Sequence, residues 1–123
     1  MAIGPIPTDI TLHQQSKELE IAFDDGRSFR LSCEFLRVHS PSAEVRGHGP
    51  GQETLQTGKK QVAITAIEPV GNYAVKLAFS DGHDTGIYSW DYLHDLGVKH
   101  AEYWKTYLER MARAGASREP VTA

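Results

Sequence analysis

The chain has 123 residues, with 13 Lys and Arg, 16 Asp and Glu and a formal net charge of −3 at pH 7. This length predicts a single domain that can bury a hydrophobic core of its own. Neither sign of charge is collected into a block, so the composition gives no support for binding to nucleic acid or to a membrane surface.

The cysteine count and the N-terminus bear on the cellular compartment. Cys33 is the single cysteine, so the chain cannot build a disulfide framework or a zinc cluster made of cysteines alone. The first residues lack the basic segment and apolar run of a signal peptide, and no stretch approaches the ~20 apolar residues of a membrane span. We therefore expect a soluble, unprocessed protein in a reducing cytoplasm.

The first third of the chain predicts a strand and a hairpin. Two prolines favour an extended lead-in over residues 1–8, because proline fixes φ and removes an amide donor. Residues 9–13 alternate between polar and apolar types, which indicates a short strand. Large apolar residues then recur at every second position, and Asp25-Gly26 supplies the positive φ that a tight turn requires. We predict a hairpin over residues 18–31.

A short helix is predicted after this hairpin. The Ser32 hydroxyl can cap its first turn, and Glu34 is placed where the helix dipole favours an anion. The helix must end before Ser40-Pro41, because the residue before a proline disfavours helical geometry. Residues 40–60 are rich in glycine and poor in apolar side chains, which indicates a long loop of the kind that is often functional or mobile.

The second half of the chain repeats the hairpin-plus-helix pattern. Residues 61–67 are rich in β-branched types and predict a strand. Pro69 and Gly71 mark the turn that should end this strand. A further strand is predicted to end at the Asp-Gly turn within residues 75–82, which align position for position with residues 19–26. A short β segment then leads to Ser89, which can cap the next helix.

Two helices are expected to close the domain. The first should end at Gly97, and the second should span residues 99–114 with an apolar stripe made of Tyr103, Trp104, Tyr107, Leu108 and Met111. Residues 115–123 are expected to form a disordered tail. The predicted fold class is α+β: an antiparallel sheet of about six strands, built from two hairpin-plus-helix units and covered by the C-terminal helix, in a single domain over residues 9–114.

Histidine and cysteine side chains are candidates for a metal site. His83 follows the second Asp-Gly turn and could ligate zinc or iron with partners drawn from His39, His48 and Cys33. The four residues contain no paired spacing such as Cys-x2-Cys or His-x3-His, so the pattern is not specific. The simpler interpretation makes His83 a turn residue whose ring bonds to a nearby carboxylate or carbonyl group.

Three other patterns each have a functional and a structural interpretation. Cys33 near a helix N-terminus could act as a nucleophile, but a free cysteine more often packs in a core. The glycine-rich stretch 47–51 could approach an anion, although no P-loop lysine follows it and a connector is the simpler interpretation. Aromatic residues could form a binding platform, yet their spacing favours core packing: Tyr88, Trp90, Tyr92, Tyr103, Trp104 and Tyr107.

Three runs of the sequence carry a resemblance to a known family. They are residues 36–49, which begin Leu-Arg-Val-His-Ser-Pro-Ser, residues 79–83, Phe-Ser-Asp-Gly-His, and residues 88–93, Tyr-Ser-Trp-Asp-Tyr-Leu. On these runs the chain resembles the gamma-butyrobetaine hydroxylase N-terminal-like family, a domain of unknown function in its bacterial stand-alone form. The resemblance covers about residues 9–112.

The resemblance has implications for metal binding. In carnitine-pathway hydroxylases a similar domain precedes the catalytic iron and 2-oxoglutarate barrel, and it holds a structural zinc through three cysteines and one histidine. The cysteine positions match Ser40, Ser42 and Val45 here, and the histidine matches His83. The resemblance therefore implies a degenerate zinc site that keeps one ligand, and we expect neither a metal nor another cofactor.

The resemblance also implies a role beside other proteins. Similar domains are fused to iron–sulfur carrier ATPases, which implies an accessory or protein-interaction module that assists iron–sulfur or 2-oxoglutarate-dependent enzymes in trans. The chain lacks the His-x-Asp motif of the hydroxylase iron site and is too short for that barrel, so we expect no enzymatic activity. A metal-binding domain that uses His83 with His39, His48 or Cys33 is the alternative.

The partner-binding surface is expected at the long loop and at the second Asp-Gly turn. The residues expected to form this surface are Arg37, His39, Ser40, Pro41, Ser42, Glu44, His48 and His83.

Overall fold

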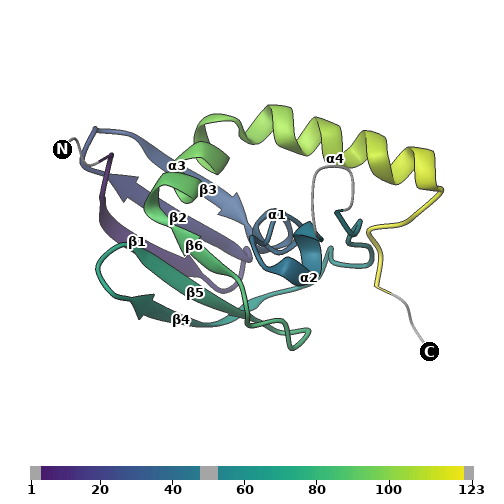
Figure 1. Cartoon of the computed structure of the whole chain (residues 1–123), viewed down its shortest axis with the longest axis horizontal. Coiled ribbons are helices and arrows are strands. Elements are labelled where there is room, and N and C mark those ends of the chain that lie inside the picture. The colour runs from purple at the N-terminus through teal and green to yellow at the C-terminus, as the bar shows by residue number, and fades with distance from the viewer. Residues whose placement is uncertain (1–3, 48–52, 121–123) are drawn as a thin grey trace.

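The fold consists of two small sheets with helices along one side (Figure 1). A computed structural model describes residues 4–47 and 53–120. Within these ranges, six strands form two three-stranded antiparallel sheets, and four helices complete an α+β fold. No helix in the described ranges is long and apolar enough to cross a membrane.

The first sheet has the order β1 (Pro7–His13), β2 (Glu18–Phe23), β3 (Ser28–Ser32). The predicted hairpin is confirmed, with the large apolar residues of β2 buried and Gly26 at a φ of 86° in the turn. β1 starts at Pro7, within the segment expected to be an extended lead-in. A proline suits this position because β1 is an edge strand and Pro7 is its first residue.

The second sheet has the order β4 (Ile64–Val70), β5 (Ala74–Phe79), β6 (Ile87–Ser89). β4 lies further along the chain than the predicted strand, and it includes Pro69, which was expected to belong to the turn. The sheet tolerates Pro69 because β4 is an edge strand, where a missing amide hydrogen interrupts no interior ladder. β5 confirms the strand predicted before the second Asp-Gly turn, and it is the central strand of this sheet.

The predicted single sheet of six strands is not confirmed. In the described ranges, no ladder joins a strand of one sheet to a strand of the other. The outer strands offer poor edges for such a ladder. β1 and β4 each contain a proline, whereas β3 and β6 continue directly into helices. The two sheets nevertheless contribute to one hydrophobic core, which includes Ile21 and Leu77.

Serine side chains cap the helices that follow each sheet. The Ser32 Oγ atom accepts a hydrogen bond from the Phe35 amide, and the Ser89 Oγ atom accepts one from the Tyr92 amide, so both predicted caps are confirmed. A third serine, Ser42, caps a one-turn helix inside the stretch predicted to be a loop. The helices are α1 (Cys33–Val38), α2 (Ala43–Arg46), α3 (Trp90–Val98) and α4 (His100–Ala114).

Gly97 was expected to end its helix, but it lies inside α3. A Cβ atom at Gly97 would approach the Phe29 ring to 2.4 Å, so the glycine allows α3 to pack closely on β3. Gly97 therefore allows contact between α3 and β3 and does not end the helix, which continues to Val98.

The C-terminal helix α4 covers α1 more than the sheets. Near its start, Tyr103 and Trp104 pack against the main core, whereas Tyr107 and Met111 form a second cluster with Val38 of α1. Figure 1 shows α4 running over α1 and past the sheets. The expected covering of the sheet is therefore met only by the first part of the helix.

The segment after α4 was expected to be disordered, but its described part, 115–120, makes several hydrogen bonds. The Gly58 and Lys60 amides donate to the carbonyl groups of Ser117 and Arg118, both at 2.9 Å. The Arg118 guanidinium binds both carboxylate oxygens of Glu34 at 2.7 and 2.8 Å. These contacts attach the segment to α1, which corrects the expectation for this part of the tail.

Candidate functional site

The two Asp-Gly turns have the same local geometry. In each turn, the aspartate accepts a hydrogen bond from the amide two residues later: Asp25 from Arg27 at 3.0 Å and Asp81 from His83 at 3.1 Å. The second carboxylate oxygen of each aspartate faces another element. His94 of α3 contacts Asp25, whereas Asp81 has two cationic partners. The repeated sequence therefore produces a repeated anchor point.

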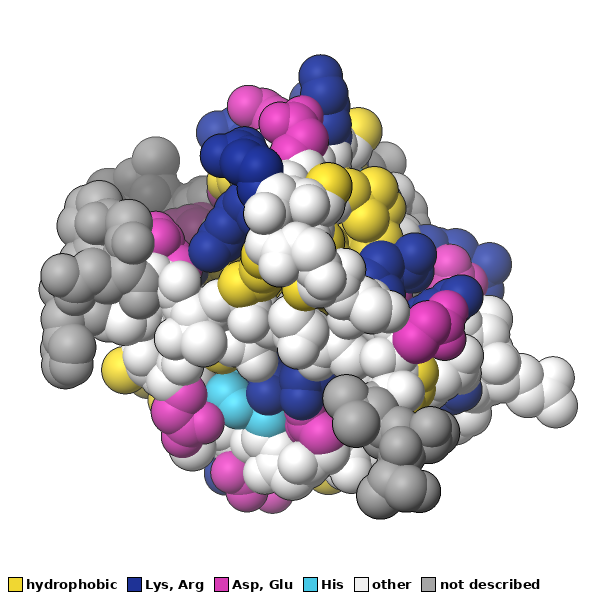
Figure 2. Space-filling model, turned by 90° about the vertical axis from the view of Figure 1, so that its right-hand side faces the viewer, with side chains coloured by type: hydrophobic (Ala, Val, Ile, Leu, Met, Phe, Trp, Pro, Cys, Tyr) yellow, Lys and Arg dark blue, Asp and Glu magenta, His cyan; other side chains and the backbone are white. Residues whose placement is uncertain are grey.

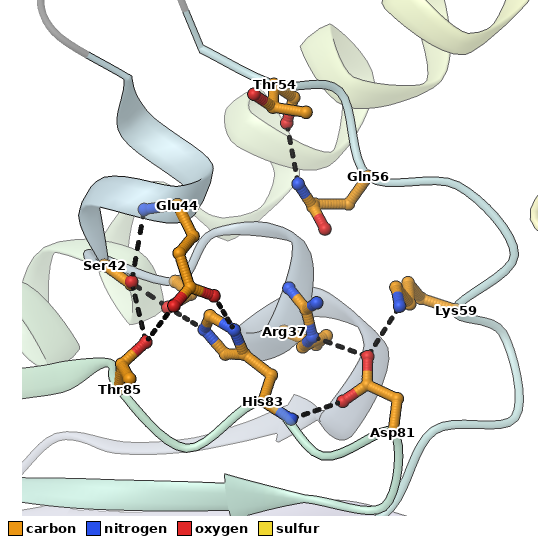
Figure 3. A network of polar contacts seen from close by, with 10 residues as sticks. Arg37, Ser42, Glu44, Thr54, Gln56, Lys59, Asp81, His83 and Thr85 are labelled. Atoms are coloured by element: carbon orange, nitrogen blue, oxygen red, sulfur yellow. Dashed lines mark hydrogen bonds and ion pairs between the residues drawn. The ribbon is translucent and has the colours of Figure 1, made fainter.

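Asp81 joins the second turn to α1 and to the loop before β4. Its Oδ2 atom accepts hydrogen bonds from Arg37 Nε at 2.8 Å and from Lys59 Nζ at 2.5 Å (Figure 3). Burial raises the pKa of Asp81, but the hydrogen bonds from Lys59, the His83 amide and Arg37 outweigh it and lower the pKa to about 2. Asp81 is therefore ionised at neutral pH.

Arg37 is the central cation of this arrangement. It is 7% exposed, and its Nη1 atom is buried without a hydrogen-bond partner among the described residues. A buried guanidinium without a counter-charge is strongly destabilising, so the ion pair with Asp81 stabilises Arg37 as much as it stabilises the turn. The sequence prediction placed Arg37 on a contact surface, whereas the structure uses it inside the molecule.

His83 and Ser40 form a buried contact between the turn and the end of α1. The His83 Nε2 atom lies 2.8 Å from the Ser40 Oγ atom, and the His83 Nδ1 atom lies 3.3 Å from a carboxylate oxygen of Glu44. Burial lowers the pKa of His83, and the Arg37 charge acts in the same direction against Glu44 and Asp81. A neutral ring that donates to Glu44 and accepts from Ser40 fits these contacts.

Ser42 and Thr85 extend the contact toward α2. Their hydroxyl oxygens are 2.8 Å apart, and the Thr85 hydroxyl donates to Glu44 at 3.4 Å. The Ser42 Oγ atom also accepts the Glu44 amide, and the Ser42 amide donates to Ser40 Oγ. We call the whole set the polar network: Arg37, Ser40, Ser42, Glu44, Lys59, Asp81, His83 and Thr85 (Figure 3).

The protein surface above the polar network is nearly flat. On the face shown in Figure 2, a histidine side chain lies level with its surroundings beside Lys or Arg side chains, with acidic side chains on both sides. His83 is 7% exposed, Ser40 1% and Ser42 8%, whereas Glu44 is exposed and Pro41 is half-buried. Basic and acidic side chains lie side by side around the buried centre, so the surface carries no strong net charge.

The order Ser40, His83, Glu44 has the connectivity of a serine hydrolase triad, but its surroundings differ from those of a nucleophile. A Cβ atom at Gly86 would lie 2.4 Å from Ser40 Oγ, so the Gly86 backbone already covers that hydroxyl. A substrate carbonyl needs this space to approach a nucleophilic oxygen. The close approach of Gly86 indicates that the three residues join two segments of the chain.

The predicted metal ligands do not come together in the described part of the chain. There, no group of three or more His, Cys, Asp or Glu side chains could hold a metal ion. His39 has its Nδ1 atom 2.9 Å from the Phe35 carbonyl oxygen, and its ring packs against Tyr103 and Tyr107. The predicted ligand and contact residue His48 lies outside the described residues.

Cys33 is a core residue. It is 1% exposed, and burial raises the pKa of its thiol, which disfavours the thiolate that a nucleophile or a metal ligand requires. From the sequence, the nearby helix N-terminus was expected to lower the pKa of this thiol and activate it as a nucleophile. Burial has the larger effect on the pKa, and it acts in the opposite direction. The structural interpretation of Cys33 is therefore supported.

Several residues of the site were not singled out from the sequence. Lys59, Asp81, Thr85 and Gly86 were passed over, although the second Asp-Gly turn was recognised as a turn. The only available signal was that residues 83–86 follow the turn directly, in a stretch without apolar residues. Arg37 and Asp81 are 44 positions apart, and local periodicity does not predict such a pairing.

Comparison with known proteins identifies the family. The model of the family described as gamma-butyrobetaine hydroxylase-like, N-terminal, matches residues 10–94. The chain belongs to this gamma-butyrobetaine hydroxylase-like N-terminal family. The match spans the polar network from Arg37 to Thr85, and it confirms the resemblance seen in the sequence. A comparison with curated proteins finds no match.

Solved structures of similar chains agree with this gamma-butyrobetaine hydroxylase-like N-terminal fold. Two proteins known from NMR solution structures are 48% and 54% identical to this chain, with TM-scores of 0.82 and 0.81. The matches cover 97% and 99% of this chain and 94% and 93% of the other chains.

A crystal structure from Acidithiobacillus ferrooxidans shows a more distant relative. It is a protein with unknown function from the DUF971 family, 41% identical, with a TM-score of 0.63. The match covers 74% of this chain and 91% of the other. The gamma-butyrobetaine hydroxylase-like N-terminal fold is thus shared with proteins that carry no assigned activity in their descriptions.

Proposed function

We propose that this domain is a non-catalytic interaction module that binds another protein beside α1, α2 and the second Asp-Gly turn. The observation that carries this proposal is the closed polar network. Ser40 and His83, which have the chemistry for catalysis, bond to each other beneath Gly86. Arg37 is held by Asp81. These polar groups stabilise the shape of the surface and leave its outer residues for contact.

Burial narrows the contact surface that we propose. Of the eight residues expected from the sequence, Arg37, Ser40, Ser42 and His83 are buried, so their role in binding would be to position their neighbours. Pro41, Glu44 and the partly exposed His39 remain accessible. A cavity that His39 and Ser40 help to line lies next to them, and we include its rim in the proposed surface.

We propose the class of partner protein from the family resemblance. Iron–sulfur carrier ATPases and 2-oxoglutarate-dependent enzymes are the first candidates, because similar domains are attached to such proteins. A single, buried cysteine suits a reducing compartment, so we place the interaction in the cytoplasm. In this proposal, the serines at the zinc-ligand positions replace a metal with hydrogen bonds, and the site acts as a structural joint.

Site-specific photo-crosslinking in cells tests the proposal. The photo-reactive residue p-benzoylphenylalanine would replace Thr106, an exposed residue at the cavity rim, or Tyr73, which is 57% exposed at the β4–β5 turn. We expect position 106 to capture one protein that position 73 does not, and the purified pair to bind each other. Capture of only chaperones and ribosomal proteins, or identical products from both positions, would contradict the proposal.

A further inference from the structure

A cavity of about 210 Å³ lies between α1, α2, the segment before β4, α3 and α4. Its apolar lining comes from Val38, Val45 and Leu55, which belong to three separate segments of the chain. Pockets for whole ligands typically occupy roughly 300–1,000 Å³. This cavity is smaller, and its size suits one large side chain better than a cofactor.

Tyrosine rings complete the wall, and their hydroxyl groups already have acceptors. Tyr92 donates to the His39 carbonyl at 2.5 Å, Tyr107 donates to the Gln56 carbonyl at 2.8 Å, and Tyr103 donates to Asp95 at 2.5 Å. Because these hydroxyl groups are occupied, the rings offer mainly carbon surface to the cavity. An apolar or aromatic group could therefore enter without leaving a tyrosine hydroxyl unpaired.

Two arginines from different helices stand at the cavity. The Arg46 guanidinium of α2 lies 4.8 Å from the centre of the Tyr92 ring, and Arg110 of α4 makes a long contact of 3.5 Å to the Glu53 carbonyl oxygen. Glu53 supplies the single carboxylate among the described lining residues. Burial and the nearby charges of His100 and Arg110 lower the pKa of His39, although its contact with Phe35 opposes this. The permanent charges therefore favour an anion.

We propose that this cavity receives a large apolar or aromatic side chain of a partner protein, and that an acidic residue beside it contacts Arg46 or Arg110. The inference rests on the proposed interaction function and specifies the chemistry of the partner. Aromatic anchors in desolvated pockets commonly dominate binding energy at protein interfaces. The arginines add charge complementarity, which selects an acidic flanking residue over a basic one.

Titration with small probes, followed by amide chemical shifts in NMR, tests this chemistry without a known partner. N-acetyltryptophan carries an aromatic ring and a carboxylate, whereas tryptamine carries a similar ring and a positive charge. We expect N-acetyltryptophan to shift the amides of Val38, Val45 and Tyr107 at millimolar concentrations. Tryptamine should bind at least about ten times more weakly, because the same arginines repel it.

Three variants test whether N-acetyltryptophan binds in this cavity. Leu55→Trp places a large ring inside the cavity and should abolish the shifts, and Arg110→Gln should weaken N-acetyltryptophan binding by about three- to tenfold. Arg113→Gln is the matched control, because Arg113 is a 77% exposed arginine on the same helix outside the cavity. Equal binding of both probes, shifts outside the cavity, or no shifts at all would overturn the inference.

The two proposals can fail separately. If position 106 captures a specific partner while N-acetyltryptophan does not bind, the interaction function stands and the chemistry assigned to the cavity is wrong. If N-acetyltryptophan binds as described while crosslinking captures no specific protein, the cavity is a site for small aromatic acids. In that case, the inference of a partner side chain is overturned together with the interaction function.

Discussion

The Nε2 atom of His83 lies 2.8 Å from the Oγ atom of Ser40, across a separation of 43 positions in the sequence. This contact joins the second Asp-Gly turn to the end of α1 and is supported on its other side by Glu44. The family resemblance places zinc ligands at both positions. In this chain a hydrogen bond between the two side chains holds these segments together.

Removal of the His83 ring should be costly for stability. His83→Ala leaves the buried Ser40 hydroxyl without an acceptor for its hydrogen, so we expect a loss of about 2–3 kcal/mol in the free energy of unfolding. His13→Ala is the control, since the His13 side chain is 31% exposed and should lose less than about 1 kcal/mol. Urea denaturation measures both, and equal small losses would mean that the contact contributes little.

Stability should fall on mild acidification. The pKa of His83 and that of His39 are lowered below 6.5 in the folded protein, so below that pH the unfolded chain binds more protons than the native protein. The free energy of unfolding should therefore decrease as pH falls from about 7.5 to 5.5. His83→Gln should have a shallower pH dependence than the wild type over this range. Stability that rises on acidification to pH 5.5 would contradict the neutral buried ring.

Asp81 should produce a second loss at lower pH. Its pKa is about 2 in the folded protein, against an ordinary value of 3.8, so its contribution is complete above about pH 5 and declines as pH falls toward 2. Asp81→Asn should remove this part of the acid dependence and leave Arg37 without its counter-charge. Denaturation curves between pH 5 and pH 2.5 test this, and an unchanged acid slope in Asp81→Asn would be the contrary result.

Gly86 should not tolerate a side chain. The alanine Cβ atom would meet Ser40 Oγ at 2.4 Å, so Gly86→Ala should cost about 1–3 kcal/mol through overpacking. Ser40→Gly removes that oxygen, and the double variant should lose less stability than the sum of the single variants. Strict additivity in this double-mutant cycle would show that Gly86 and Ser40 are not in close contact.

Introducing cysteines at the positions that the family resemblance matches to zinc ligands tests the inferred relation to a zinc site. The triple variant Ser40→Cys, Ser42→Cys, Val45→Cys should bind one zinc ion with His83 as the fourth ligand. Adding His83→Gln should weaken zinc binding by at least about tenfold. Competition with a chromophoric chelator gives the affinity, and zinc binding that does not depend on residue 83 would show that these positions do not converge on one metal.

Local patterns predicted most of the secondary structure. Alternation identified β2 and β5, and the hydroxyl groups of Ser32 and Ser89 marked two helix starts, because these signals depend on near neighbours in the chain. The separation into two sheets could not be predicted, since it depends on which strand edges meet. Gly97 was misinterpreted for the same reason: its function is contact with Phe29, far away in sequence.

The candidate site was predicted only in part. The resemblance singled out Ser40, Ser42 and His83, and the structure brings Ser40 and His83 into contact. Burial was not foreseen, so buried residues were assigned to a contact surface. The cavity could not be predicted at all, because its walls come from four helices and a loop that meet only in the folded chain.

The most direct test of the central claim asks whether Ser40 is a structural hydroxyl or a nucleophile. The folded protein would be treated with a fluorophosphonate probe that labels activated serines, and the adducts would be mapped by mass spectrometry. We predict no adduct on Ser40, because Gly86 covers its oxygen and His83 occupies its hydrogen bond. An adduct on Ser40 that disappears in His83→Gln would show that Ser40, His83 and Glu44 form a working catalytic triad.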